Sequence, residues 1–333
     1  MLGKLFLILS CTACIIAAVD PQVYTFKSID GLDLKISVYV PEAPPSSGKY
    51  PILFATHGGG YIAGGRDTAF TPRQLEEILN RGWVAVTMDY RLQPVVLLDE
   101  LYQDVQDAYQ WVRTELIKIL PVDLDRIAAF GGSAGGGLAL MNGYKLNPRP
   151  KVIIALYPYC TNFNDAKIYQ PDTPVPSSVV ALAESVTDNV LEHTFGTRAD
   201  SRYKLWMAAL SSAKVGWLFA SHNPEEPVEN VIAKLKDFSA TENVDENYPP
   251  TYLAHGLKDY IVSYTQSVQM AEKLQENGVK YVLDLVPSVG HTFDSHNSES
   301  IWQEHVLPAF EFAQQYLKDA EEVQVEEAFL AVQ

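Results

Sequence analysis

One serine, Ser133, lies in a pattern that suits nucleophilic catalysis. The pattern is Gly-x-Ser-x-Gly, with Gly131 and Gly135 on either side, and it follows the apolar, strand-like run 126–130. A serine hydroxyl attacks a carbonyl when a base takes its proton and the backbone presents it clear of its neighbours. A sharp strand-to-helix turn does this and requires flanking residues without side chains. Because the motif also occurs by chance, the chain must supply the other parts of the chemistry.

A second glycine-rich run could stabilise the charge that such an attack creates. Residues 57–60 read His-Gly-Gly-Gly and follow the apolar run 51–56 directly. Backbone N–H groups in such a loop can face a ligand, and one donor to an oxyanion contributes about 3–4 kcal/mol of transition-state stabilisation. We expect the oxyanion hole to consist of the amides of Gly58, Gly59 and Ala134. His57 itself is expected to bond the loop and not to act as the base.

The best-placed base among the seven histidines is His291. It follows Gly290 in the loop after the apolar run 281–286, which is the last expected strand. A base needs to sit on a loop at a strand end, where it can reach the serine. Surface or packing roles are expected for three others, namely His193, His222 and His305.

The expected acid is Asp259, just beyond the apolar strand 251–255. A carboxylate there can hold the imidazole in the correct tautomer. His255 ends the same strand and lies too near Asp259 in sequence to serve as the base. Asp294 is the alternative acid, and its position three residues from His291 disfavours it. Cys160 ends another strand-like run and is expected to be a buried small hydrophobe.

The chain order Ser133, Asp259, His291 is that of the α/β-hydrolases and differs from the orders in chymotrypsin-like and subtilisin-like proteases. With this order, the chain between residues 24 and 317 resembles the hormone-sensitive-lipase-like carboxylesterase group, also called α/β-hydrolase fold-3. The resemblance rests on these segments: His57-Gly58-Gly59-Gly60, Asp89-Tyr90-Arg91-Leu92, Gly131-Gly132-Ser133-Ala134-Gly135-Gly136, Asp259 and Gly290-His291.

Three positions depart from that group's pattern. Gly132 stands where the group usually has Asp, Gln93-Pro94-Val95 stands for Ala-Pro-Glu, and Asp259-Tyr260-Ile261 stands for Asp-Pro-Leu. All three triad residues are nevertheless present. The departures therefore bear on the substrate, and on whether hydrolysis is the physiological reaction.

The resemblance implies a serine hydrolase that cleaves carboxylic ester bonds of a small or medium substrate through an acyl-enzyme. No cofactor and no metal are expected. One alternative is a natural-product biosynthetic hydrolase, or an acyl-transfer or cyclising enzyme that uses the same site. Another is a non-catalytic ligand-binding protein on the same fold, as in gibberellin receptors, which have lost the base that His291 would supply here. Fold alone does not separate these functions.

The elements that would position these residues alternate between strands and helices. Near-continuous apolar strands indicate a mostly parallel central sheet with flanking helices, as in the α/β-hydrolase fold. The expected strands are 24–29, 34–40, 51–56, 83–88, 126–130, 151–157, 251–255 and 281–286. The expected helices are 70–81, 99–120, 137–144, 264–277 and 298–317. Between 162 and 247 we expect an inserted helical cap, with helices at 177–192 and 202–210.

Length and composition suit one large domain with an insertion. The 333 residues are 47% hydrophobic, so a substantial core is expected, and a net charge of −16 disfavours nucleic-acid binding. The sequence leaves the oligomeric state open. We divide the chain into a signal peptide (1–18), an α/β-hydrolase core (19–161 and 248–318), the helical cap (162–247) and an acidic tail (319–333).

The first 18 residues resemble a secretory signal peptide. Lys4 precedes an uncharged run that ends near Ala17-Ala18 and is too short to span a bilayer comfortably. We therefore expect a secreted or secretory-lumen protein with no stable membrane span after cleavage. The alternative is an intracellular protein with an uncleaved hydrophobic N-terminus. Cys11 and Cys14 fall within this segment, so the mature chain would hold no internal disulfide.

Overall fold

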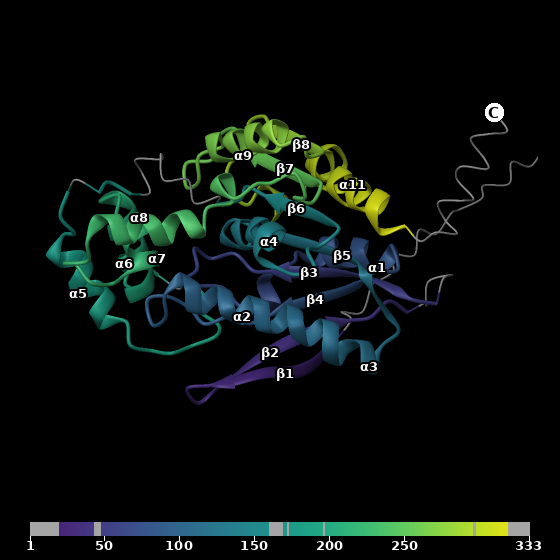
Figure 1. The fold of residues 1–333 in the computed structure, drawn as a ribbon, viewed down its shortest axis with the longest axis horizontal. Coiled ribbons are helices and arrows are strands. Elements are labelled where there is room, and N and C mark those ends of the chain that lie inside the picture. The colour runs from purple at the N-terminus through teal and green to yellow at the C-terminus, as the bar shows by residue number, and fades with distance from the viewer. Residues whose placement is uncertain are drawn as a thin grey trace, which may run out of the picture.

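Eight strands within the described part of the chain form one sheet, in the order β1-β2-β4-β3-β5-β6-β7-β8 (Figure 1). The computed structural model describes residues 20–42, 48–159, 169–171, 173–195, 197–295 and 298–318. The expected signal peptide, the acidic tail, Cys160 and His296 lie outside them. The strands are β1 (Gln22–Ile29), β2 (Leu32–Tyr39), β3 (Tyr50–Thr56), β4 (Val84–Met88), β5 (Val122–Gly132), β6 (Val152–Leu156), β7 (Thr251–Gly256) and β8 (Tyr281–Val286).

The strand directions confirm the expected mostly parallel sheet. β1 pairs antiparallel with β2, and β2 antiparallel with β4, while the other five pairings are parallel. Every residue of β3, β4 and β6 is buried, because helices cover both faces of the sheet there. Parallel strands covered on both faces have to be apolar throughout, which is why these strands are apolar runs in the sequence.

Helices pack on the two faces of the sheet through alternating strand residues. Ile52 and Phe54 of β3 share a core cluster with residues of α2 and α4. Leu53 and Ala55 belong to a second cluster, with residues of α1 and α11. α9 and α4 cover the sheet around β6 and β7. These helices are α1 (Pro72–Asn80), α2 (Leu98–Trp111), α3 (Ile117–Ile119), α4 (Ala134–Lys145), α9 (Thr265–Glu276), α10 (Glu299–Ile301) and α11 (Leu307–Leu317).

In the described residues between β6 and β7, four α-helices lie together at one end of the sheet (Figure 1). They are α5 (Ser177–Ser185), α6 (Ser201–Ser211), α7 (Val215–Ala220) and α8 (Val228–Asp237). All four fall in the segment for which we expect a cap, and no described residue of 169–247 belongs to a strand of the sheet. The limits of the cap stay a prediction. None of the described helices has the length and apolarity needed to cross a membrane.

The expectation of a helix through residue 192 is wrong, because α5 ends at Ser185. Val186 adopts an extended conformation, and the backbone carbonyl of Asp188 accepts a hydrogen bond from Arg202. Further along, His193 pairs with Gly64 of the core. These tertiary contacts take the place of helical hydrogen bonds after Ser185. α7 and α8 were not expected, since polar residues around Asn223 obscure their short apolar stripes.

Candidate active site

Ser133 lies on a sharp turn between β5 and α4. Its backbone angles, φ 57° and ψ −124°, are unusual for a residue with a side chain and persist only where the surroundings hold them. A Cβ on Gly131 would collide with Gly135, and one on Gly135 would collide with the Thr56 carbonyl. The turn is held by the Ser133 N–H, which donates to the Leu156 carbonyl over 3.0 Å. The flanking glycines thus allow the tight turn that exposes the serine side chain.

A hydrogen-bonded chain links Ser133 to the two other residues selected from the sequence. His291 Nε2 lies 2.9 Å from Ser133 Oγ, and His291 Nδ1 lies 2.6 Å from Asp259 Oδ2. Since the carboxylate accepts from Nδ1, the imidazole places its free electron pair at Nε2, toward the serine. Ser133 and His291, which are 158 positions apart in the sequence, thereby meet at the carboxyl end of the parallel strands. This geometry is suited to removing the serine proton.

Asp259 is held by several donors. Its Oδ1 accepts the N–H groups of Ile261 and Val262, each over 2.9 Å. Burial alone would raise the pKa of this carboxyl, but hydrogen bonds from His255, His291 and the Val262 amide outweigh burial and hold the pKa well below its usual range. The group is therefore an ionised acceptor at neutral pH, and its orientation is fixed from both sides.

His255 also contacts Asp259, which the sequence did not lead us to expect. Its Nε2 lies 3.1 Å from the Val262 carbonyl and 3.2 Å from Asp259 Oδ2, and its Nδ1 lies 2.7 Å from Ser267 Oγ. A carbonyl only accepts, so Nε2 carries the proton and Nδ1 accepts from the serine. His255 is fully buried and does not face the cavity around Ser133. The four-residue spacing from Asp259 was the available signal.

Asp294, the alternative acid, has other partners. Its Oδ1 accepts from the Tyr157 hydroxyl over 2.5 Å, and its Oδ2 accepts from Gln74 over 2.8 Å. Burial raises the pKa of Asp294, while these two hydrogen bonds act in the opposite direction. Tyr157 in turn packs edge-on against the His291 ring at 4.8 Å. Asp294 thus lines the same cavity as Ser133, but the carboxylate that is hydrogen-bonded to His291 is that of Asp259.

Tyr157 also accounts for one departure from the hormone-sensitive-lipase pattern. A Cβ on Gly132 would lie 2.8 Å from the Tyr157 hydroxyl and 3.1 Å from two ring carbons. Real Cβ atoms do not approach other atoms so closely, so the aspartate usual at this position would displace the ring. In this chain the space beside the serine is occupied by an aromatic side chain from the end of β6.

The glycine loop, residues 57–64, runs beside Ser133. A Cβ on Gly58 would lie 3.0 Å from the Gly132 carbonyl oxygen and 3.5 Å from Ser133 Cβ. Gly58, Gly59 and Ala134 line the same cavity as Ser133 and His291. The three residues expected to form the oxyanion hole therefore lie in the wall of the cavity that also holds the serine.

The remaining histidines within the described residues have structural partners. His57 Nδ1 bonds the Gly58 carbonyl over 2.8 Å, its ring stacks on Tyr90 at 3.9 Å, and burial lowers its pKa to about 4. His57 is thus neutral and holds the loop, as the sequence predicts. The contacts of the other three are His193 with Asp200 (2.8 Å), His305 with Asp284 (2.8 Å) and His222 with the Trp217 ring (6.3 Å).

The cavity around Ser133 has a volume of about 430 Å³. Loops after β3, β5, β6, β7 and β8 contribute to it, together with the cap segment that contains His193 and α6. Its wall is largely aromatic and apolar, with a polar patch at Gln74 and Asp294. Phe195, Trp206 and Ile261 are among its apolar side chains. The cavity suits a small or medium organic substrate.

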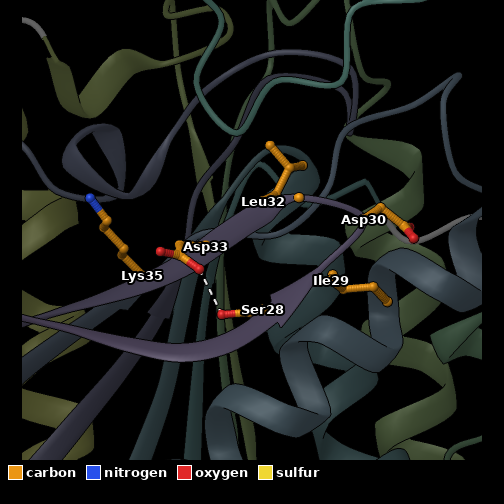
Figure 2. Close-up of a pocket in the computed structure, with 7 residues that line it drawn as sticks. Ser28, Ile29, Asp30, Leu32, Asp33 and Lys35 are labelled. Atoms are coloured by element: carbon orange, nitrogen blue, oxygen red, sulfur yellow. Dashed lines mark hydrogen bonds between the residues drawn. The ribbon is translucent and has the colours of Figure 1, made fainter.

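A second cavity, of about 560 Å³, lies at the β1–β2 turn and is lined by residues 28–33 and 35. Its one serine, Ser28, donates a 2.6 Å hydrogen bond to Asp33, as Figure 2 shows. These lining residues include no histidine or cysteine. Ser28 thus has no histidine beside it of the kind that Ser133 has, so the first cavity is the candidate active site.

Comparison with curated proteins finds relatives among fungal polyketide synthases. Over 340 residues the chain is 26% identical to the non-reducing polyketide synthase ascC of Acremonium egyptiacum, a match that covers 90% of this chain and 16% of that protein. Over 344 residues it is 28% identical to the 5-methylorsellinic acid synthase of Aspergillus terreus, covering 88% and 13%. The chain therefore spans less than a fifth of the length of these relatives.

Among solved structures, the fold is similar to that of the esterase Est2 of the Planctomycetes species Thermogutta terrifontis with propionate bound. The TM-score is 0.61 at 20% identity, and the match covers 90% of this chain and 93% of that one. The family model BD-FAE matches residues 36–274. That span includes Ser133 and Asp259, and ends before His291. With this match and this fold, the chain belongs to the BD-FAE family and is an α/β-hydrolase related to the carboxylesterases.

Proposed function

We propose that this protein hydrolyses carboxylic esters of small or medium size, with Ser133, Asp259 and His291 as the catalytic residues. The observation that carries the proposal is the hydrogen-bonded chain from Ser133 Oγ through His291 to Asp259, at the wall of a 430 Å³ cavity. A serine, an oriented base and an ionised acid in this arrangement are the parts of an acyl-transfer site.

The reaction would proceed in two halves. His291 Nε2 takes the proton of Ser133 as Oγ attacks the ester carbonyl, and the new oxyanion receives N–H groups of Gly58, Gly59 and Ala134. The imidazolium then protonates the leaving alcohol, and an acyl-enzyme remains. Water enters, gives a proton to His291 and attacks the acyl carbon. Collapse of this second intermediate releases the acid and returns the proton to Ser133.

Two features support an ester with a modest acyl group. The cavity volume of about 430 Å³ is near the lower end of the range typical of ligand pockets. The structural neighbour Est2 holds propionate, a three-carbon acid. Phe195 and Trp206, two aromatic residues of the cap, would form part of the wall around such an ester.

The direct test is turnover of p-nitrophenyl esters of rising acyl length by purified wild-type protein and Ser133→Ala. We expect the wild type to prefer short chains and Ser133→Ala to lose several orders of magnitude in kcat. Asp259→Asn should keep the fold and lose about 10⁴-fold in kcat. Ser295→Ala is the matched control, because Ser295 lines the same cavity but donates to the Thr292 carbonyl. Wild-type turnover in Ser133→Ala would contradict the proposal.

A second candidate is acyl transfer or cyclisation in natural-product assembly. It is favoured by the polyketide synthase relatives, in which the matched stretch is 13% to 16% of the whole protein. The same acyl-enzyme would form, and a hydroxyl other than water would attack it. Product analysis with an added alcohol separates the two functions. Ester as the main product favours transfer, and free acid favours hydrolysis.

We also propose the division of the chain given from the sequence, with residues 1–18 removed in a secretory pathway and residues 162–247 acting as a cap over Ser133. The short basic start and uncharged run support the first point. Cap residues in the cavity wall support the second. N-terminal sequencing of the native protein tests whether residues 1–18 are removed, and an intact Met1 would contradict cleavage.

A further inference from the structure

The glycine loop has a strained backbone. Three successive residues have positive φ, namely Gly59 (106°), Gly60 (64°) and Tyr61 (64°). Glycine adopts such angles freely, but a tyrosine there is disfavoured, and a strained backbone persists only when its surroundings fix it. The contacts that fix this loop therefore decide where the amides of Gly58 and Gly59 point.

Part of that support comes from the loop and from the neighbouring core. The Gly59 carbonyl accepts the N–H groups of Ile62 over 3.2 Å and Ala63 over 2.9 Å. The Tyr61 carbonyl accepts the N–H of Gln93 over 2.9 Å. These bonds close the turn, but they leave the carbonyl of Ile62 for another partner.

The cap supplies further contacts. Gly64 and His193 exchange two backbone hydrogen bonds, of 2.7 and 2.9 Å, as in an antiparallel pair. Next to them, Arg66 forms a 2.8 Å ion pair with Glu192. The end of the glycine loop is thus joined to the cap by backbone as well as by side chains.

The guanidinium of Arg202, on α6, joins the remaining pieces. This side chain is fully buried, and its Nη1 donates to the carbonyls of Ile62, over 3.2 Å, and of Gln93. Its Nη2 donates to the Asp188 carbonyl over 2.6 Å. A buried cation is costly unless its donors are satisfied. Its donors bind the glycine loop at Ile62 and the cap at Asp188. They also bind Gln93, whose N–H donates to the Tyr61 carbonyl.

We propose that Arg202 is a positioning residue that fixes the glycine loop from the cap, so that the cap governs turnover at Ser133 as well as access to it. This inference rests on the proposed function, because the proposed function assigns the oxyanion donors Gly58 and Gly59 to the glycine loop. Arg202 does not line the cavity, and it acts through the Ile62 and Gln93 carbonyls.

The test compares Arg202→Met and Arg202→Lys with the control Lys204→Met, an exposed residue of the same helix. In both Arg202 variants we expect kcat for a p-nitrophenyl ester to fall roughly tenfold to hundredfold, with KM changed less than about threefold, because the oxyanion donors act mainly in the transition state. Amide hydrogen exchange should accelerate in residues 57–64 and stay unchanged in β5 and α4. The control should match the wild type.

Two results would overturn the inference. One is unchanged exchange in the glycine loop of a folded Arg202 variant, and the other is a change in KM alone. If Arg202→Met is insoluble, Arg202→Lys decides by the same readouts. If the wild type turns over no ester, the proposed function fails, but the exchange measurement still decides whether Arg202 fixes the loop.

Discussion

His255 Nε2 lies 3.2 Å from Oδ2 of Asp259, the same oxygen that bonds His291. Two imidazoles thus share one carboxylate oxygen, one facing Ser133 and the other fully buried behind it. The buried ring is fixed by Ser267 at Nδ1 and by the Val262 carbonyl at Nε2. Because this ring does not line the cavity, we expect it to act by orienting the acid.

We therefore expect His255→Phe to lower kcat by roughly tenfold, because Asp259 loses a donor but keeps the Ile261 and Val262 amides. The effect should be far smaller than that of Asp259→Asn. Steady-state kinetics on a soluble ester measure it, with Ser263→Ala as the control, a half-buried serine of the following loop that bonds Thr265 and not Asp259. A loss as large as that of Asp259→Asn would contradict the orienting role.

Gly132→Ala is expected to destabilise the protein by about 1–3 kcal/mol, since the new Cβ would overlap the Tyr157 ring. The ring cannot swing away without breaking its 2.5 Å bond to Asp294. Urea unfolding measures the change. The double variant Gly132→Ala/Tyr157→Leu should show a smaller cost than the sum of the two single changes. Additive costs would mean that the two residues do not compete for space.

The buried His57 predicts a dependence of stability on pH. Its folded pKa is about 4, below the unfolded value of 6.5. Stability is therefore complete above pH 6.5 and declines as pH falls toward 4, because only the unfolded chain binds the proton. The decline attributable to His57 is about 3 kcal/mol. In His57→Asn, which keeps a donor for the Gly58 carbonyl, denaturant unfolding should show a correspondingly shallower decline. Identical pH profiles would contradict this assignment.

Trp206 is expected to limit the size of the substrate. It lies on α6 in the cavity wall, and a Cβ on Gly60 would come within 3.2 Å of its ring. Trp206→Leu opens space on the cap side, so the ratio of kcat/KM for long over short acyl esters should rise about tenfold. Met207→Ala, an exposed neighbour on the same helix, is the control. An unchanged ratio would exclude Trp206 as a selector of chain length.

The sheet was predictable because its central strands contain continuous apolar runs, as β3 and β6 illustrate. The helix at 177–192 was only partly predictable, because Asp188 leaves it to bind Arg202, a contact with no local signal. The helical patterns at 99–120 and 298–317 gave no sign of the π-helical turns at 112–116 and 302–306.

Ser133, Asp259 and His291 could be selected from the sequence, because each follows a predicted strand and the three stand in the chain order of the α/β-hydrolases. The sequence did not reveal the second histidine on Asp259, the close approach of Tyr157 to Gly132, or the hydrogen bonds from Arg202 to the glycine loop and the cap. These depend on side chains packed between distant segments.

The most direct measurement is acid quenching of the protein during turnover of a p-nitrophenyl ester, followed by peptide mass spectrometry. We predict one acyl group per chain on the peptide that contains Ser133, and none in Ser133→Ala, with an initial burst of p-nitrophenol of about one equivalent wherever deacylation is the slower step. Ser295→Ala should label like the wild type. Turnover without any adduct on Ser133, or with an adduct on another residue, would contradict the central claim that Ser133 is the nucleophile.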